Sequence, residues 1–363
     1  MGYCFKHILF YRYGRCPKCL ESEVRALPDA AKYQLIGREN ALLANPWKLN
    51  QDQFGVCGLA TPVYLIMRSA KDKARQLFEA TFADIIPDFA NTKFLTSNYG
   101  PQSVKFRYLA RGYRLQQRSW EKKQDKRLKQ EMKRYEPQLR QVYTTKQELR
   151  EGRDELRRDI KEQLGQWHGE LLVDYCMSRA LGYIMKNTAP SRYTGEKINF
   201  NSEFSTTQNY REVTRMGHLA LRTNNATFVL SELLGAKDVH IAKQKVEASV
   251  PLAPPVSGVT ETQFETVARL HNLFQTHASG RGSFAMAAIY AGLVNEGSML
   301  IKKSQGDAKF PRLSYNHWVN IEKFDLTTNN VELLIWTWAK FWRVRVDKNV
   351  FLSYIQDVIF GHF

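Results

Sequence analysis

The charged segment from Lys105 to Gln166 restricts the possible folds of this chain more than any other feature. It is poor in glycine, and its apolar residues recur every three or four positions, as on one face of a helix. The clearest repeats are Leu128, Met132, Tyr135, Leu139 and Val142, followed by Leu149, Leu156, Ile160, Leu164 and Trp167. This pattern predicts two long helices packed as a hairpin or short coiled coil, with the second helix starting at Pro137.

The same segment holds much of the net charge of +17, which arises from 53 Lys and Arg against 36 Asp and Glu. Such a charge favours acidic partners, whether nucleic acid, an anionic membrane surface or an acidic protein. A basic helical face could grip nucleic acid, but aromatic residues that would stack on bases are sparse here. A solvated helical insertion is therefore the favoured interpretation, and nucleic acid is the less favoured partner.

Four residues with the side chains that zinc prefers lie close together at the start of the chain. Cys4 and His7 form one pair, Cys16 and Cys19 form the other, and each pair is separated by two residues. Four nitrogen and sulfur ligands suit a tetrahedral structural zinc. The alternatives are a redox pair or buried thiols with an incidental histidine. We expect a small zinc knuckle that stabilises the N-terminal segment.

The cysteine count and the lack of sorting signals indicate the cellular compartment in which the protein is made. The odd number of five cysteines, three of them near the N-terminus, does not resemble a secreted disulfide framework. The opening residues lack a clean signal peptide, and no stretch reaches about 18 uninterrupted apolar residues. We expect a protein made in a reducing cytoplasm with no transmembrane helix, and injection by a secretion machine would leave the same pattern.

Helical signals dominate the first two thirds of the chain, and strand signals dominate the last third. Apolar periodicity predicts helices over 57–82 and 171–185, the second burying Cys176. A linker spans 250–258, and a capping box at Thr260–Gln263 predicts a helix that reaches His277. The apolar run 284–294 predicts a buried helix. We expect neighbouring antiparallel strands at 298–303, 313–324 and 331–346, the last two joined by a loop at 327–330, and a final helix over 349–360. The resulting fold class is α+β.

The helix predicted at 57–82 carries the most reactive candidate, Cys57, near its start. A thiol at a helix N-terminus has a lowered pKa because the helix dipole favours the thiolate. Gln51 lies six residues upstream and could donate a hydrogen bond to an oxyanion. Pro62 allows two starting points, either Cys57 with a kink or Thr61, because proline is comfortable only in the first turn.

A thiol nucleophile needs a histidine, and His317 is the best placed of the eight in the chain. It opens a predicted strand, whereas the others lie in helical, lysine-rich, terminal or metal-ligand contexts. In this arrangement the sequence resembles the papain-like cysteine peptidase superfamily. That family places an oxyanion glutamine six residues before a nucleophile at a helix start, and its histidine opens a strand of a C-terminal sheet. Gln51, Cys57 and His317 match these roles in order.

The family often has Asn or Asp before a Ser-Trp-Gly, and this chain has Trp336-Thr337-Trp338-Ala339 instead. The tryptophan is present, but the asparagine is absent. The group that orients the histidine is therefore left open among Thr337, Asn316 and Asp325, and a dyad without a third member is the remaining alternative.

The resemblance implies a papain-like core with a helical-hairpin insertion, of the divergent type found in bacterial toxins and secreted effectors. The implied segments are a zinc knuckle (1–25), the helical half with the nucleophile (26–104), the charged insertion (105–168), a mixed region with a linker (169–259) and the sheet half with the histidine (260–363). The implied activity is thiol-dependent hydrolysis of amide or peptide bonds in a protein or peptide, with deamidase or acyltransferase chemistry as variants. The basic helices would then contact an inhibitor, an immunity protein or a delivery protein. The alternative is a non-enzymatic, zinc-containing protein that binds nucleic acid or another protein.

Overall fold

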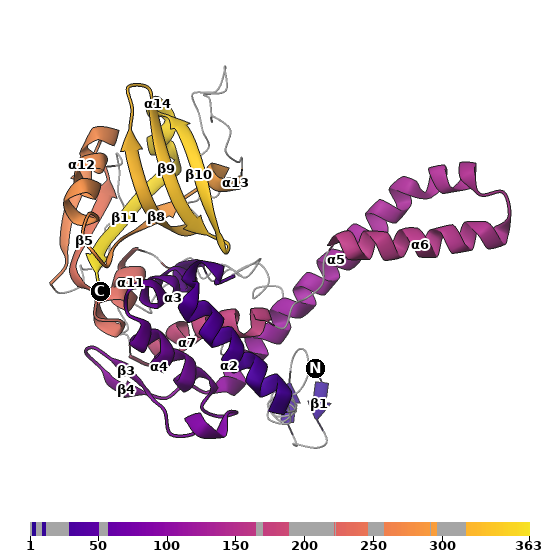
Figure 1. The fold of residues 1–363 in the computed structure, drawn as a ribbon, viewed down its shortest axis with the longest axis horizontal. Coiled ribbons are helices and arrows are strands. Elements are labelled where there is room, and N and C mark those ends of the chain that lie inside the picture. Colours follow the sequence, from indigo (N-terminus) through magenta and orange to yellow (C-terminus); the bar gives the residue numbers. More distant parts are fainter. Residues whose placement is uncertain are drawn as a thin grey trace.

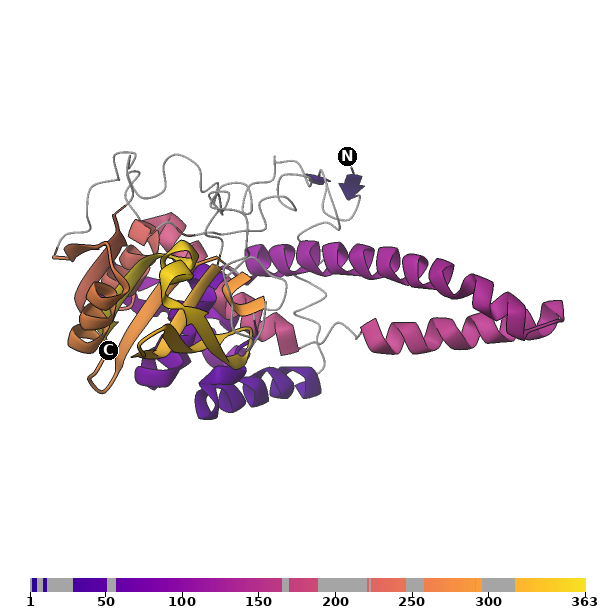
Figure 2. The same ribbon diagram turned by 90° about the horizontal axis from the view of Figure 1, so that it is seen from above.

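A mostly antiparallel sheet and a layer of helices form the body of the protein, and a helical hairpin projects from it (Figures 1 and 2). The computed structural model describes residues 2–4, 9–11, 29–50, 57–164, 170–188, 221, 223–245, 258–290, 292–295 and 317–363. The chain is therefore α+β, as the sequence predicts. Among the helices of these ranges, none is both long enough and apolar enough to span a bilayer.

Seven strands make the main sheet, in the order β10-β9-β8-β7-β11-β5-β6. Their bounds are β5 Lys237–Gln244, β6 Thr260–Phe264, β7 Ser283–Ile289, β8 His317–Leu326, β9 Asn330–Thr337, β10 Lys340–Asp347 and β11 Ile355–His362. All neighbours are antiparallel except β5 and β6, which run parallel. The sequence correctly predicts the loop between β8 and β9, but the predicted strand 331–346 is in fact the hairpin of β9 and β10. The predicted strand 298–303 lies outside the described residues.

In three places the sequence predicts a helix where the structure has a strand. The capping-box segment is strand β6, and helix α12, Val267–His277, begins later with Thr266 as its N-cap. The predicted buried helix 284–294 is strand β7 followed by the short helix α13, Gly292–Asn295. The predicted last helix is the short helix α14, Lys348–Phe351, a 3-10 turn and then strand β11 in the interior of the sheet. The last two errors share one cause, because a continuous apolar run suits a fully buried strand as well as a buried helix.

Helices cover one face of the sheet as a separate layer (Figure 1). The layer contains α2 Asp29–Ala44, α3 Cys57–Ser69, α4 Lys71–Phe82, α7 Glu170–Thr188 and α11 Thr223–Phe228, together with the small hairpin of β3 Phe94–Thr96 and β4 Gly100–Gln102. The helix predicted over 57–82 is thus two helices separated at Ala70. Helix α7 matches the predicted helix, and Cys176 on it is buried.

The two faces of the sheet belong to two different hydrophobic cores. Trp318 and Trp336 pack into the core that the helical layer shares with the sheet. Their neighbours Val319 and Ile335 pack into a second core on the opposite face, which α12 covers. This alternation along β8 and β9 is the two-residue period of a strand buried on both faces.

The projecting hairpin consists of α5, Phe106–Val142, and α6, Lys146–Leu164. The predicted pair of helices is confirmed, but Pro137 lies inside α5 and does not start the second helix. Pro137 is exposed, so the carbonyl of Lys133 that it leaves without an N–H partner faces water. At the turn, the ring of Tyr143 lies against Gly152, where an added Cβ would meet the ring at 2.3 Å.

Candidate functional site

Cys57 is the first residue of α3, at the junction of the helical layer and the sheet. Its side chain is only 6% exposed. Burial raises the pKa of its thiol, and hydrogen bonds from the backbone of Trp318, Gly58 and Cys57 itself lower it. The burial effect is the larger, so the resting thiol is protonated at neutral pH. The sequence expectation of a lowered pKa from the helix dipole is therefore wrong for this structure.

The structure decides between the two predicted starts of the helix. Helix α3 runs from Cys57 and contains Pro62, so the start at Thr61 is wrong. Pro62 has no N–H for the carbonyl of Gly58, one turn earlier. Thr61 instead fixes the helix to the sheet, because its Oγ1 donates a hydrogen bond to the carbonyl oxygen of Trp318 at 3.2 Å.

His317 is the first residue of β8 and pairs in register with Ile289 of β7. Its Nε2 lies 2.7 Å from Oγ1 of Thr337, the last residue of β9. Its ring stacks on Trp338, with ring centroids 4.3 Å apart and an interplanar angle of 21°. Burial lowers the pKa of His317 to about 3, so the imidazole is neutral at pH 7.

The turn that presents Trp338 has an unusual backbone. Trp338 and Ala339 connect β9 to β10, and their φ angles are 48° and 58°. Two consecutive residues with positive φ are typical of the two-residue hairpin turn whose twist matches the strands, but Gly or Asn usually occupies it. A tryptophan in this conformation carries strain that the surrounding structure must offset. The turn holds the indole against the imidazole.

Cys57 and His317 lie on elements that meet near the start of β8, but their side chains face different sides of the sheet. Cys57 belongs to the core shared with the helical layer, whereas His317 alternates with Trp318 along the strand and lies with Trp338 on the opposite side. The Cys57 thiol contacts the backbone of Trp318, the residue that follows His317. Of the groups predicted to orient the histidine, Thr337 contacts it, whereas Asp325 forms an ion pair with Lys323. Gln51 and Asn316 lie outside the described residues.

The predicted zinc ligands fall almost entirely outside the described part of the chain. Cys4 ends strand β1, Gly2–Cys4, which pairs with β2, Leu9–Tyr11, but its side chain is not described. His7, Cys16 and Cys19 lie outside the described residues. Within the ranges that are described, no group of three or more His, Cys, Asp or Glu side chains is arranged to hold a metal. The zinc knuckle remains a prediction.

A buried polar network next to the site escapes the sequence analysis. The Tyr64 hydroxyl donates to Glu322 of β8, and Arg68 Nη1 forms an ion pair with Glu322 at 2.7 Å. The ring of Tyr64 stacks on Trp336, with centroids 3.8 Å apart and planes 7° apart. The sequence feature that could have indicated this network is the four-residue spacing of Tyr64 and Arg68, which places two polar groups on one face of an otherwise apolar helix.

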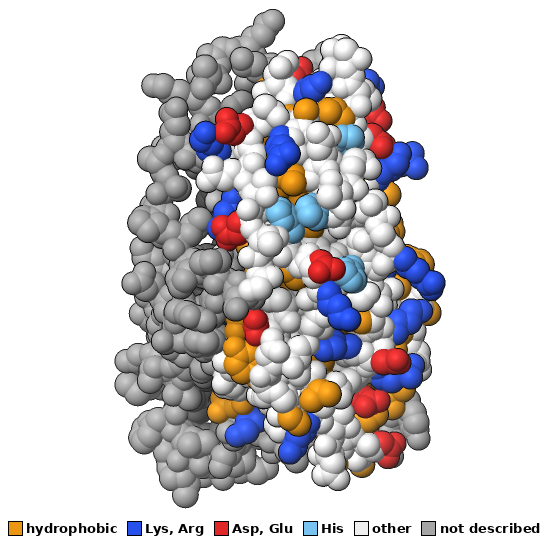
Figure 3. All heavy atoms as spheres, turned by 90° about the vertical axis from the view of Figure 1, so that its left-hand side faces the viewer, with side chains coloured by type: hydrophobic (Ala, Val, Ile, Leu, Met, Phe, Trp, Pro, Cys, Tyr) orange, Lys and Arg blue, Asp and Glu red, His pale blue; other side chains and the backbone are white. Residues whose placement is uncertain are grey.

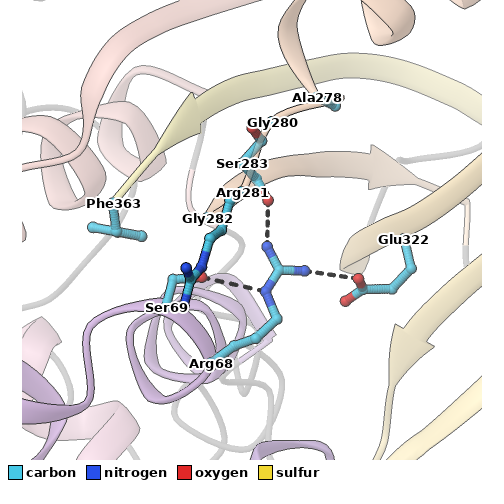
Figure 4. A pocket seen from close by; sticks show the side chains of 9 residues that line it. All are labelled: Arg68, Ser69, Ala278, Gly280, Arg281, Gly282, Ser283, Glu322 and Phe363. Atoms are coloured by element: carbon cyan, nitrogen blue, oxygen red, sulfur yellow. Dashed lines mark hydrogen bonds and ion pairs between the residues drawn. The ribbon is translucent and has the colours of Figure 1, made fainter.

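A cavity of about 580 Å³ lies at the far end of α3, where this network reaches the surface. Figure 4 shows the Arg68 guanidinium between the carbonyl of Ser283 and the carboxylate of Glu322, with Arg281 on the neighbouring glycine-rich turn. Arg68 follows Cys57 by eleven positions, which is about 16 Å along a helix. The cavity is therefore separate from the start of β8.

The remaining described histidines lie away from Cys57. Figure 3 shows histidines gathered on the side of the molecule that carries α12 and β5. His240 and His277 stack there, with ring centroids 4.3 Å apart, and His240 Nδ1 lies 2.7 Å from Thr260 Oγ1. The sequence indicates no partner for His240, but the structure gives it His277 and Thr260. Among the described histidines, only His317 is adjacent in sequence to a residue whose backbone contacts the Cys57 thiol.

Comparisons of the chain with models of known families, with curated proteins and with solved structures find no match. The geometry at the start of β8, together with the order of the residues along the chain, therefore carries the functional argument.

Proposed function

We propose that the protein is a thiol-dependent hydrolase of amide or peptide bonds, with Cys57 as nucleophile and His317 as its proton acceptor and donor. The observation that carries this proposal is the arrangement at the start of β8. A histidine held by Thr337 and Trp338 immediately precedes the residue whose backbone contacts the Cys57 thiol. The order of these groups along the chain is that of the papain-like superfamily.

The protonation states exclude a resting thiolate–imidazolium pair, and proton transfer from Cys57 to His317 requires substrate binding to bring the two pKa values closer together. The pKa of His317 is lowered and the pKa of Cys57 is raised, so both groups are neutral before substrate binds. If the Nε2 proton of His317 is donated to Thr337, Nδ1 is the basic nitrogen. A threonine hydroxyl can orient the ring, but it cannot offset the positive charge of an imidazolium as a carboxylate would.

The reaction then proceeds through an acyl-enzyme. His317 takes the thiol proton as the Cys57 sulfur attacks the substrate carbonyl, and the resulting oxyanion accepts hydrogen bonds from the Cys57 backbone N–H and from Gln51. Each such donor typically contributes about 3 kcal/mol to stabilising the transition state. His317 returns the proton to the leaving amine, and water hydrolyses the thioester. The proton transfer requires His317 Nδ1 to reach hydrogen-bond distance of the Cys57 sulfur around the end of β8.

The test is the rate at which iodoacetamide alkylates Cys57 at pH 7, followed for each cysteine by peptide mass spectrometry. We expect Cys57 to react at least ten times faster in the wild type than in His317→Ala, because the base assists removal of the thiol proton. Thr337→Val should slow the reaction by a smaller factor, whereas Thr337→Ser should react like the wild type because it keeps the hydroxyl.

Cys176 is the internal control for folding. It is fully buried on α7, and burial raises the pKa of its thiol, so it reacts only when the helical layer opens. A variant in which Cys176 becomes reactive is misfolded. If His317→Ala misfolds in this way, it is replaced by His317→Gln, which keeps a polar side chain at the site. The hydrolase proposal fails if a Cys57 in folded protein reacts no faster than Cys176, or if removing His317 leaves its rate unchanged.

A further inference from the structure

The two helices of the projecting hairpin carry very different charges. Helix α5 contains twelve Lys and Arg residues against four Asp and Glu residues, whereas α6 contains six of each. On α6 the opposite charges neutralise each other along the helix, as in the pair of Arg157 and Asp154 at 3.2 Å. The excess positive charge of the hairpin therefore belongs to α5.

The charge on α5 is also sorted by face. Its half-buried residues Leu128, Met132, Tyr135 and Leu139 recur at helical spacing on the side that packs against α6. Away from this side lie four exposed lysines that we call the basic face: Lys122, Lys126, Lys129 and Lys133. Arg127 is exposed on the other flank of the helix. The four lysines follow one another at intervals of four, three and four residues, so they form one stripe along the helix.

Three lysines of the basic face and the nearby Arg127 carry charge that the protein itself does not neutralise. Among the residues that the structure describes, Lys126, Arg127, Lys129 and Lys133 form no ion pair. Of the acidic residues near these lysines on α5, Glu131 pairs with Arg134, and Glu136 binds Arg140 on the same helix and Arg153 across the hairpin. Asp125 is exposed beside the stripe, a single carboxylate against four lysines. The hairpin extends away from the body (Figure 2), and the side chains of the basic face are exposed.

The composition of this face distinguishes between kinds of acidic partner. A protein partner needs apolar anchors at the centre of the interface, and a membrane-binding helix needs an apolar face that enters the lipid. The other exposed residues between Lys122 and the end of α5 are mostly polar or charged: Asp125, Gln130, Arg134, Pro137, Gln138, Arg140 and Gln141, with Val142 at the turn as an exposed hydrophobic residue. Lysine, arginine and glutamine are the side chains that contact nucleic acid phosphates, and these contacts need no apolar surface.

We propose that the basic face of α5 binds the phosphate backbone of double-stranded nucleic acid, without regard to base sequence. From Lys122 to Lys133 the stripe spans about 16 Å of helix, a length over which a duplex presents about ten phosphates. Four lysine–phosphate contacts predict that the logarithm of the affinity falls with the logarithm of the salt concentration with a slope near −3.6. Between 50 and 200 mM salt, the affinity should therefore fall about 150-fold. This binding does not depend on the Cys57 site.

The experiment uses the full chain and a fluorescein-labelled 30-base-pair DNA duplex, with anisotropy measured from 50 to 200 mM NaCl. The test variant replaces Lys122, Lys126, Lys129 and Lys133 with Gln. The matched control replaces four exposed basic residues of α6, Lys146, Arg150, Arg157 and Arg158, with Gln, which changes the net charge by the same amount. Circular dichroism verifies that both variants keep the helical content of the wild type.

We expect the α5 variant to bind the duplex at least tenfold more weakly at 100 mM NaCl and with a salt slope close to zero. The α6 control should stay within about threefold of the wild type. The proposal is overturned if both variants lose affinity equally, because net charge alone would then explain binding, or if neither loses affinity. Cosedimentation with vesicles of phosphatidylserine and phosphatidylcholine adds a third arm, and binding to vesicles without binding to the duplex would also overturn the proposal.

Discussion

His317 should make the folded protein sensitive to mild acid. The ordinary pKa of a histidine is 6.5, and burial lowers the pKa of His317 to about 3 in the folded protein because the buried imidazole resists protonation. Between these values the unfolded chain binds a proton that the folded protein does not, so stability falls as the pH falls from 6.5 towards 3. Lowering the pH from 7 to 5 should reduce the free energy of unfolding by about 2 kcal/mol through this residue alone.

The measurement is urea unfolding at pH 7 and pH 5 for the wild type and for His317→Gln. Glutamine does not titrate, and its amide can still donate a hydrogen bond to Thr337. Other groups with shifted pKa values, such as His240 and Asp357, contribute equally to both proteins, so the difference isolates His317. We expect the wild type to lose about 2 kcal/mol more than the variant. Equal losses would refute the neutral buried imidazole. A smaller loss in the wild type would indicate a thiolate–imidazolium pair, because a charged His317 would have a raised pKa.

Two substitutions away from the site test the structural framework. Asp174 on α7 is fully buried and accepts hydrogen bonds from Arg38 Nε at 3.0 Å and from the backbone N–H of Asn50 at 2.7 Å. Asp174→Asn should therefore cost about 3 kcal/mol of unfolding free energy, seen as a lower urea midpoint, and a loss below about 1 kcal/mol would contradict this role. Thr266 caps α12, its side chain accepting a hydrogen bond from Arg269 N at 3.1 Å. Thr266→Ala should cost about 1 kcal/mol with an unchanged denaturant slope, and Thr266→Ser should restore most of it.

Helical periodicity in the sequence predicts the hairpin of α5 and α6 and the helix α7, because each has a long repeat that only a helix satisfies. It does not predict strands β7 and β11, since a short apolar run buried on both sides has no period to distinguish strand from helix. The capping pattern at Thr260–Gln263 is a local signal, and parallel pairing of β6 with β5 outweighs it. A capping box involves residues three positions apart, so it carries no information about which distant strand a segment pairs with.

The candidate site shows the same division between local and distant information. The sequence indicates Cys57 and His317 by their chemistry and by their positions at the start of a helix and a strand. It names Thr337 only as one of three ways to orient the histidine, because the contact depends on the register of β8 against β9. The pairing of β8 with β9 shifts register between Ile321 and Lys323, and no pattern in the sequence predicts this shift. The stacking of Trp338 depends on a turn with positive φ at residues that seldom adopt it.

The proposed nucleophile and its base belong to different layers of the molecule. Cys57 lies in the core shared with the helical layer, whereas Trp338, which stacks on His317, packs against the core on the opposite face of the sheet. Because the helical layer and the sheet share the first core, the packing of that core sets the spacing between α3 and β8. Hydrolysis would then depend on how closely α3 sits on β8, which the contacts of Tyr64 and Arg68 with Glu322 determine. A ligand that separates α3 from β8 at Glu322 would therefore disturb the shared core and lower the proposed hydrolysis from about 16 Å away, without touching the thiol.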